Sequence, residues 1–295
     1  MKVAIYGRGL DKSHTEHLFI LLQELFQFNI KAIIHTDLLT FLQDQIFSNN
    51  IHPEVFNTHT ELDDSIECLI SLGGDGTLLD TVTLVRNKNI PVMGINMGRL
   101  GFLASIGRED LTHAVESLVN HSYVVDERVL INISANAPLF TDAPFGLNEL
   151  VLHKRDVSPM IKIHTYLNGE FLNTYWADGL IVSTPTGSTG YSMSCGGPIV
   201  FPDSQSFVIT PIAPHSLNVR PLIIPDNNII SFEIESRSDE YICTLDARHE
   251  LVNQKVQVSI KKESFGIQLI RLNENSFLQT LRTKLTWGFD KRNYQ

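Results

Sequence analysis

The 295-residue sequence has few cysteines, no long apolar run and no excess of basic residues. Its three cysteines, Cys68, Cys195 and Cys243, are scattered, and no two have the spacing of a metal-ligand pair. A reduced, cytoplasmic chain is therefore expected. No stretch approaches the roughly 18 consecutive apolar residues of a membrane-spanning helix. The N-terminus also lacks an apolar run followed by a small-residue cleavage site, so no signal peptide is expected.

The charge balance excludes further classes of protein. With 23 Lys and Arg against 33 Asp and Glu, the formal net charge is −10 at pH 7. Such a chain is poorly suited to the backbone of nucleic acids or to an anionic membrane surface. A phosphate-bearing ligand is still possible, because backbone N–H groups, hydroxyls and metal ions hold phosphate without changing the net charge of the chain.

The first part of the chain alternates short apolar runs with segments of helical period, which is typical of parallel strands joined by right-handed crossovers. Apolar runs predict strands at Val3–Tyr6, Ala32–His35, Ile66–Leu72 and Val92–Ile95. Apolar residues on one helical face predict helices at Thr15–Phe28 and Thr77–Arg86, and a further helix is expected near Arg108–Asn120.

After this point the pattern changes to short strand candidates separated by Gly, Pro, Asn or Asp, which favours an antiparallel sandwich or layered sheet. The candidates are Val129–Ala135, Glu149–His153, Ile161–Leu167, Leu180–Thr184, Ile229–Glu235, Ile242–Asp246, Lys255–Lys261 and Gly266–Arg271. A last amphipathic segment, with Phe277, Leu278, Leu281 and Leu285 on one face, is expected to pack back on the N-terminal domain.

These patterns predict an α/β fold combined with an all-β fold. The N-terminal domain is expected to be Rossmann-like with a parallel sheet, over residues 1–121 joined by the C-terminal segment 272–295. The C-terminal domain, residues 122–271, is expected to be β-sandwich-like.

A glycine-rich loop, Gly73–Thr77, lies directly between a predicted strand and a predicted helix. Glycines let the backbone approach a ligand closely, and the N–H groups at the helix start favour phosphate. Asp75 would repel phosphate, so it is interpreted as a carboxylate that holds Mg²⁺ or takes a proton from an attacking hydroxyl. A tight turn in which Asp75 caps the helix is the alternative. The sequence has no Walker loop, and Gly7–Arg8–Gly9 lacks the third glycine of a dinucleotide fingerprint.

A second loop, Pro185–Ser192, follows the predicted strand that Asp178–Gly179 opens, and it is crowded with hydroxyls and carries no charge. Hydroxyls and backbone N–H groups can wrap a pyrophosphate or a ribose, and Tyr191 offers a ring for stacking. A serine nucleophile is not favoured, because the G-x-S-x-G spacing is not met. A hairpin loop rich in Ser and Thr, with no ligand, is the alternative.

Together these loops resemble the NAD kinase family, and the match covers about Ile66 to Gly288. The resemblance rests on the ordered occurrence of six motifs and not on any one of them. They are Gly73–Thr77, Asn96–Phe102, Asn148–Glu149, Asp178–Pro198, the stretch Thr210–Leu217 with Arg220–Leu222, and Lys284–Gly288.

The resemblance implies transfer of a phosphate from ATP to the 2′-hydroxyl of the adenosine ribose of NAD⁺, with Asp75 as the catalytic carboxylate. It implies Mg²⁺, or another divalent metal, bound with ATP, but no metal ligand in the chain is assigned. A homodimer or homotetramer is also implied. The nucleotide-binding positions that it implies are Gly73, Gly74, Gly76, Thr77, Phe102, Asn148, Glu149, Asp178, Ser188, Thr189, Tyr191, Ser194 and Asp246.

Two positions depart from the family pattern. Gly190 stands where many members have alanine, and Asp246 is followed by Ala247 where glycine is common. The roles of Asp246, His215 and Arg220 stay open, as do the range of phosphate donors, the use of NADH and inhibition by NADPH. The competing hypotheses are a lipid kinase of the diacylglycerol or sphingosine type, which shares the GGDGT loop, and a catalytically silent NAD(P) sensor. A lipid kinase is disfavoured because no basic amphipathic helix is present.

Overall fold

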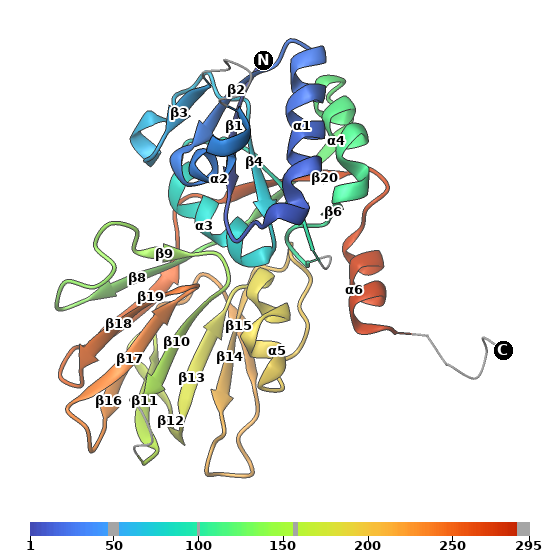
Figure 1. Cartoon of the computed structure of the whole chain (residues 1–295). Coiled ribbons are helices and arrows are strands. Elements are labelled where there is room, and N and C mark those ends of the chain that lie inside the picture. The colour runs from blue at the N-terminus through green and yellow to red at the C-terminus, as the bar shows by residue number, and fades with distance from the viewer. Residues whose placement is uncertain (47–52, 99–100, 156–158, 288–295) are drawn as a thin grey trace. The chain divides into compact units, whose positions relative to one another are not determined.

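The structure is a computed structural model that describes residues 1–46, 53–98, 101–155 and 159–287 (Figure 1). The chain divides into two compact units. The first contains Met1–Glu127 together with Ile267–Gln295, and the second contains Arg128–Gly266. No helix within the described ranges is long and apolar enough to cross a membrane.

An eight-stranded sheet forms the centre of the first unit, in the order β3-β2-β1-β4-β5-β20-β7, with β6 paired to β5. The strands β1 to β5 pair in parallel, as the sequence pattern predicts. Strand β20 also pairs in parallel with β5, although its residues were expected among the antiparallel strands of the second domain. The strands are β1 (Lys2–Gly7), β2 (Lys31–His35), β3 (Glu54–Phe56), β4 (Cys68–Gly73), β5 (Val92–Asn96), β6 (Ile106–Gly107), β7 (Tyr123–Arg128) and β20 (Ile267–Leu272).

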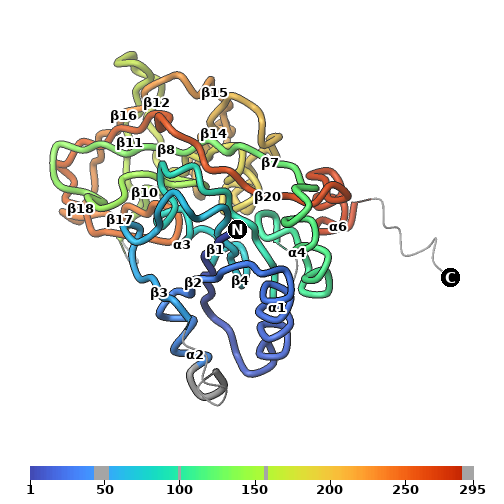
Figure 2. The backbone as a smooth tube through the Cα atoms, turned by 90° about the horizontal axis from the view of Figure 1, so that it is seen from above, coloured from blue at the N-terminus to red at the C-terminus, as the bar shows by residue number. Residues whose placement is uncertain are grey.

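Helices cover both faces of this sheet. Helices α1 (Thr15–Gln27) and α4 (Leu111–Val119) lie side by side (Figure 2), and their buried leucines join one apolar core with the sheet. Helix α2 (Thr36–Ile46) adds Leu38 and Leu42 to the same core. Helix α3 (Asp75–Val85) covers the opposite face, where Leu78 packs against Gly94 of β5.

The order of the strands reverses beside β1, because the chain runs outward to β2 and β3 and then returns to β4 on the other side of β1. In open parallel sheets, ligands bind at the carboxyl ends of the strands at such a reversal. Here β1 ends at Gly7 and β4 ends at Gly73, so the predicted glycine loop lies at this point. The Thr77 hydroxyl donates to the carbonyl of Arg8 at 3.4 Å and connects the two strand ends.

The second unit is a sandwich of two six-stranded sheets, with orders β15-β14-β13-β10-β17-β18 and β12-β11-β16-β19-β8-β9. Buried side chains from both sheets, among them Phe207 and Phe232, form a single apolar core. The strands are β8 (Ile131–Ala135), β9 (Phe145–Gly146), β10 (Glu149–Lys154), β11 (Ile161–Leu167), β12 (Glu170–Ala177), β13 (Gly179–Ser183), β14 (Ser206–Ile212), β15 (Leu222–Pro225), β16 (Ile230–Glu235), β17 (Glu240–Leu245), β18 (Arg248–Asn253) and β19 (Val258–Lys262).

The final helix α6 (Phe277–Leu285) belongs to the first unit, which confirms the expected return of the chain. Thr280 and Leu281 are its buried residues, and just before it the Asn275 side chain donates to the carbonyl of Ser105 at 3.1 Å. The side chain of Ser276 caps the helix, because its hydroxyl accepts from the backbone N–H of Gln279.

Several elements differ from the sequence-based expectation. Helix α2 was not predicted, and α3 begins at Asp75, two residues before the expected Thr77. Strand β14 was also missed, although it is buried throughout, because its Thr210 and Pro211 interrupt the apolar pattern that marks a strand. Strand β4 begins at Cys68, whereas the apolar run begins at Ile66.

The sandwich core allows a test of the second unit. Phe207 is fully buried in it, whereas Phe171 is 57% exposed. We expect Phe207→Ala to lower the free energy of unfolding by about 3–5 kcal/mol, because it leaves a cavity in a packed core. The matched variant Phe171→Ala is expected to lower it by less than about 1 kcal/mol. Denaturant unfolding measures both, and equal losses would contradict this assignment of the core.

Candidate active site

The glycine loop forms the entrance to helix α3. Gly74 is the N-cap residue and Asp75 is the first residue of the helix, which runs for 11 residues. The first backbone N–H groups of a helix lack partners within the helix and point out of its N-terminal end, so they favour an anion there. Thr77 is buried at this end, whereas Gly74 and Gly76 are exposed. The structure thus places the four predicted donor-site residues Gly73, Gly74, Gly76 and Thr77 around one turn.

The carboxylate of Asp75 does not cap its own helix but holds a distant segment. Its Oδ2 accepts from the backbone N–H of Phe102 at 2.8 Å, and its Oδ1 accepts from Leu103 and Ala104, both at 3.0 Å. A Cβ at position 101 would lie 1.8 Å from Asp75 Oδ1, so any larger residue there would displace the carboxylate. The structure therefore joins the two predicted motifs Gly73–Thr77 and Asn96–Phe102 through one carboxylate.

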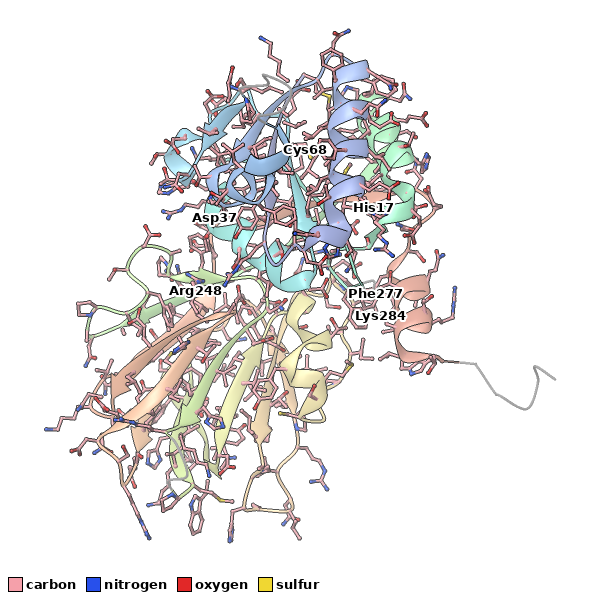
Figure 3. All side chains as sticks on the ribbon, viewed as in Figure 1. His17, Asp37, Cys68, Arg248, Phe277 and Lys284 are labelled. Carbon is pink, nitrogen blue, oxygen red and sulfur yellow. The ribbon has the colours of Figure 1, made fainter. Side chains whose placement is uncertain are left out.

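The second of these motifs starts at the end of β5. The backbone N–H of Met97 donates to the carbonyl of Gly73 at 3.1 Å, and the side-chain oxygen of Asn96 accepts from Gly98. Two residues of the motif, Arg99 and Leu100, lie outside the described residues, as does Gly288 of the last motif. Phe102 is half-buried, and the Lys284 ammonium of α6, labelled in Figure 3, lies 5.8 Å from its ring centroid.

One cation near the loop was not predicted as a site residue. Arg8 follows β1, and its guanidinium donates to Asp80 Oδ2 of α3 at 3.1 Å. The Tyr6 hydroxyl donates to the same oxygen, and burial together with the charge of Asp80 raises the pKa of Tyr6. The Arg8 side chain is 69% exposed. Its place between two glycines at a strand end was the available signal in the sequence.

In the second unit, Asp246 holds the predicted Asn148–Glu149 pair. Its Oδ1 accepts from the backbone N–H of Asn148 at 2.7 Å and of Glu149 at 3.1 Å, and its Oδ2 accepts from Leu147 at 2.7 Å. Thr184, which was not singled out as a site residue, holds the same segment from the other side. It donates from its hydroxyl to the carbonyl of Leu147 at 2.6 Å and from its N–H to that of Asn148 at 2.8 Å.

The hydroxyl loop packs directly on this segment. A Cβ at Gly187 would lie 2.1 Å from the carbonyl oxygen of Asn148, so only glycine fits there. Ser188, which was predicted to line a ligand groove, is fully buried, and its hydroxyl donates to Pro185 and accepts from the N–H of Val200. Its hydroxyl therefore holds the loop in shape. By contrast, Tyr191 is 41% exposed and Ser194 is exposed as well.

Four further residues of the motifs make contacts within the second unit. Thr189 and Asp178 were predicted as site residues, whereas the roles of His215 and Arg220 were left open. Thr189 donates its hydroxyl to the carbonyl of Thr186 within the loop. Asp178 forms an ion pair with Lys154 at 2.8 Å. The ring of His215 stacks on Trp176 with centroids 4.5 Å apart. Arg220 donates to the backbone carbonyls of Leu217 and Val219, so it supports its own loop.

Glu149 is a predicted binding residue whose surroundings shift its pKa. Its residue is 9% exposed, and Oε2 is buried without a hydrogen-bond partner in the described part of the chain. Burial, and secondarily the charge of Asp246, raise the pKa of Glu149 to about 8. Among the described residues no group of three or more His, Cys, Asp or Glu side chains could hold a metal ion.

The contact between Gly101 and Asp75 predicts that alanine destabilises the protein at position 101 but not at position 98. We expect Gly101→Ala to lower the free energy of unfolding by about 1–3 kcal/mol, because the added methyl group overlaps the carboxylate. Hydrogen exchange at the amides of Phe102, Leu103 and Ala104 should become faster. In the control Gly98→Ala the nearest atom to the new Cβ is 3.9 Å away, so protection should stay unchanged. Unaltered exchange in Gly101→Ala would contradict the described contact.

The sequence matches two family models in order. Residues 19–123 match the ATP-NAD kinase N-terminal domain, and residues 147–272 match the ATP-NAD kinase C-terminal domain. Among curated proteins, the NAD kinase of Cytophaga hutchinsonii is 48% identical over 295 residues, covering 99% of this chain and 100% of that protein. The NAD kinase of Flavobacterium psychrophilum is 45% identical with the same coverage.

Two solved structures share the fold. Yeast NADH kinase, solved in complex with NADH, has a TM-score of 0.85 at 22% identity and covers 98% of this chain and 88% of its own. An NAD kinase from Archaeoglobus fulgidus, solved with ATP, has a TM-score of 0.74 at 23% identity and covers 97% of this chain and 99% of its own. The two family matches and the near-full-length similarity to curated relatives establish that this chain belongs to the NAD kinase family.

Proposed function

We propose that this protein transfers the terminal phosphate of ATP to the 2′-hydroxyl of the adenosine ribose of NAD⁺ and so forms NADP⁺. The observation that carries the proposal is a carboxylate, Asp75, fixed by backbone N–H groups at the phosphate-binding end of helix α3. The free cysteines Cys68, Cys195 and Cys243 are consistent with a reducing compartment, and we assign the protein to the cytoplasm.

The glycine loop receives the donor phosphates. Gly73, Gly74, Gly76 and Thr77 surround the start of α3, where N–H groups without helical partners favour negative charge. The guanidinium of Arg8, held by Asp80 at the neighbouring strand end, supplies a positive charge beside the loop. Phosphoryl transfer requires alignment of the two oxygens and neutralisation of charge more than covalent participation by the protein.

Asp75 acts as the general base. A carboxylate has about four acceptor positions, and the three described N–H donors leave Oδ2 with a single partner. Oδ2 can therefore accept the proton of the 2′-hydroxyl while Oδ1 keeps the carboxylate oriented. A base positioned in this way contributes about 10²–10⁴-fold to the rate, because a ribose hydroxyl is a poor nucleophile near neutral pH.

The second unit binds the dinucleotide. Asn148 and Glu149 offer an amide and a carboxyl group with buried oxygens, Asn148 Oδ1 and Glu149 Oε2, that have no partner among the described residues. Tyr191 and Ser194 offer an exposed ring and an exposed hydroxyl, and Asp178 faces Lys154. Thr189 and the buried Ser188 shape the loop. In the first unit, the half-buried Phe102 offers an apolar ring to a base.

A divalent metal fits this chemistry as a companion of the nucleotide. Among the described residues Asp75 is the carboxylate at the donor loop, and no cluster of three ligands is present. Mg²⁺ bound with ATP would neutralise the charge that develops on the transferred phosphoryl group.

We also propose that the two compact units correspond to the functional domains expected from the sequence, residues 1–121 with 272–295 and residues 122–271. The first unit then carries the donor loop and the base, and the second carries the dinucleotide-binding residues. No single unit contains all the predicted site residues, so activity is expected to need both.

The function is tested with Asp75→Asn, which keeps the size of the side chain and removes its basic charge. We expect formation of NADP⁺ from NAD⁺ and ATP with Mg²⁺ to fall by at least about 10²-fold in kcat, while the Kd for NAD⁺ changes little. The control is Asp64→Asn, which alters an exposed carboxylate of the same unit and should leave kcat unchanged. Binding of NAD(P) without any NADP⁺ formation by the wild type would favour the sensor hypothesis instead.

The chain is further proposed to assemble as a homodimer or homotetramer. We expect sedimentation velocity at assay concentration to give a mass of two or four times 33.2 kDa. A single species at the monomer mass, with full activity, would contradict this part of the proposal.

A further inference from the structure

Two carboxyl groups, Glu149 and Asp246, lie close together at one end of the second unit. Asp246 stands in the turn between β17 and β18, and its N–H donates to the carbonyl of Glu149 at 3.0 Å. Its carboxylate accepts the three successive N–H groups of Leu147, Asn148 and Glu149. Because hydrogen bonds to a charged acceptor are the strong ones, this arrangement fixes the segment that bears Asn148 and Glu149.

The hydrogen bonds differ between the two carboxyl groups. Burial raises the pKa of Asp246, and its three N–H donors and the charge of Arg248 act in the opposite direction. Glu149 has no comparable support, because its Oε2 is buried without a partner in the described part of the chain. Burial and the nearby charge of Asp246 both disfavour the ionised form of Glu149, so Glu149 is the member of the pair that holds a proton more readily.

Two arginines of this unit donate hydrogen bonds to groups other than Glu149. The guanidinium of Arg248, labelled in Figure 3, donates to the backbone carbonyls of Ala143 and Phe145. Arg128 donates to the hydroxyl of Thr186 at 3.5 Å. From the hydroxyl loop, the uncharged Gly190 faces Glu149, since a Cβ there would lie 3.2 Å from Oε2.

We propose that Asp246 is a positioning residue for the Asn148–Glu149 segment, and that Glu149 beside it binds the dinucleotide in its protonated form, donating a hydrogen bond to an acceptor atom of the nucleoside. Both carboxylate oxygens of Asp246 accept from backbone N–H groups of this segment, so Asp246 acts on the ligand through the segment that it holds. The inference rests on the proposed binding of NAD⁺ in the second unit, and it adds the chemical state of the group that recognises it.

The coupling between proton binding by Glu149 and NAD⁺ binding gives the direction in which the Kd for NAD⁺ depends on pH. Burial and the charge of Asp246 raise the pKa of Glu149 to about 8, so the proton is present at pH 7 and is lost as the pH rises. If the protonated form is required, the Kd for NAD⁺ should increase about 10-fold between pH 7 and pH 9, because the protonated fraction falls by that factor.

The first experiment requires no NAD⁺. The ¹³C chemical shift of the Glu149 carboxyl carbon is followed against pH in the unliganded full chain. We expect a midpoint near pH 8 in the wild type, and a lower midpoint in Asp246→Asn because the neighbouring charge is gone. The control Asp239→Asn changes an exposed carboxylate at the far end of β17 and should leave the Glu149 midpoint unchanged.

The second experiment measures NAD⁺ binding by calorimetry at pH 7 and pH 9. Glu149→Gln keeps a neutral donor at this position, so its Kd at pH 7 should lie within about threefold of the wild type, and its pH dependence should disappear. Asp246→Asn, which offers one oxygen for three N–H groups, should weaken binding at both pH values and accelerate amide exchange at residues 147–149. Because Glu149→Gln leaves the Asp246 contacts in place, it tests the proposal even if Asp246→Asn does not fold.

The outcomes separate this inference from the proposed function. A Glu149 midpoint in the range of an ordinary carboxyl group, or a large loss of NAD⁺ affinity in Glu149→Gln at pH 7, would overturn the inference even in a chain that forms NADP⁺. If instead the wild type forms no NADP⁺ and does not bind NAD⁺, the proposed function fails, and the ligand part of the inference fails with it, whatever the midpoint.

Discussion

The hydrogen bonds between one aspartate and three successive backbone N–H groups are the constraint on which the proposed site residues of each unit depend. Asp75 holds the amides of Phe102 to Ala104 in the first unit, and Asp246 holds those of Leu147 to Glu149 in the second. A loop that presents polar side chains to a ligand leaves backbone donors without partners, and a carboxylate satisfies several of them at once. Each loop thereby acquires a fixed shape before any ligand is bound.

This device explains how a chain with a net charge of −10 can serve a phosphate-bearing ligand. The carboxylates nearest the proposed sites are directed at backbone N–H groups or paired with cations, as Asp80 is with Arg8 and Asp178 is with Lys154. Their negative charge is therefore balanced by N–H dipoles and by guanidinium or ammonium groups, so it repels the phosphates of the ligand less. The N-terminus of helix α3 is left to meet the phosphates.

The sequence predicted elements that follow from local patterns of residues, but it did not predict the hydrogen bonds between segments far apart in the chain. Strand β4, the glycine loop and α3 follow from periodicity and from Gly73, Gly74 and Gly76, so the loop was placed correctly between a strand and a helix. The partners of Asp75 lie 27 to 29 residues away and those of Asp246 lie 97 to 99 residues away, and no local pattern encodes such pairs. Ser188 was assigned to a ligand groove by the resemblance to the family, but the side of the loop on which its hydroxyl lies is decided by Val200, 12 residues on.

The departure from the family pattern at Ala247 follows from the same geometry. In the turn between β17 and β18 the left-handed conformation falls on Asp246, with φ of 52°, and Ala247 is not among the described residues with positive φ. Aspartate tolerates that region better than most residues, so this turn does not require glycine after it. At Gly187 the requirement is steric, because a Cβ would overlap the carbonyl of Asn148. Alanine is therefore tolerated at position 247 but not at position 187, because Asp246 and Thr184 hold the backbone of Asn148 in place beside Gly187.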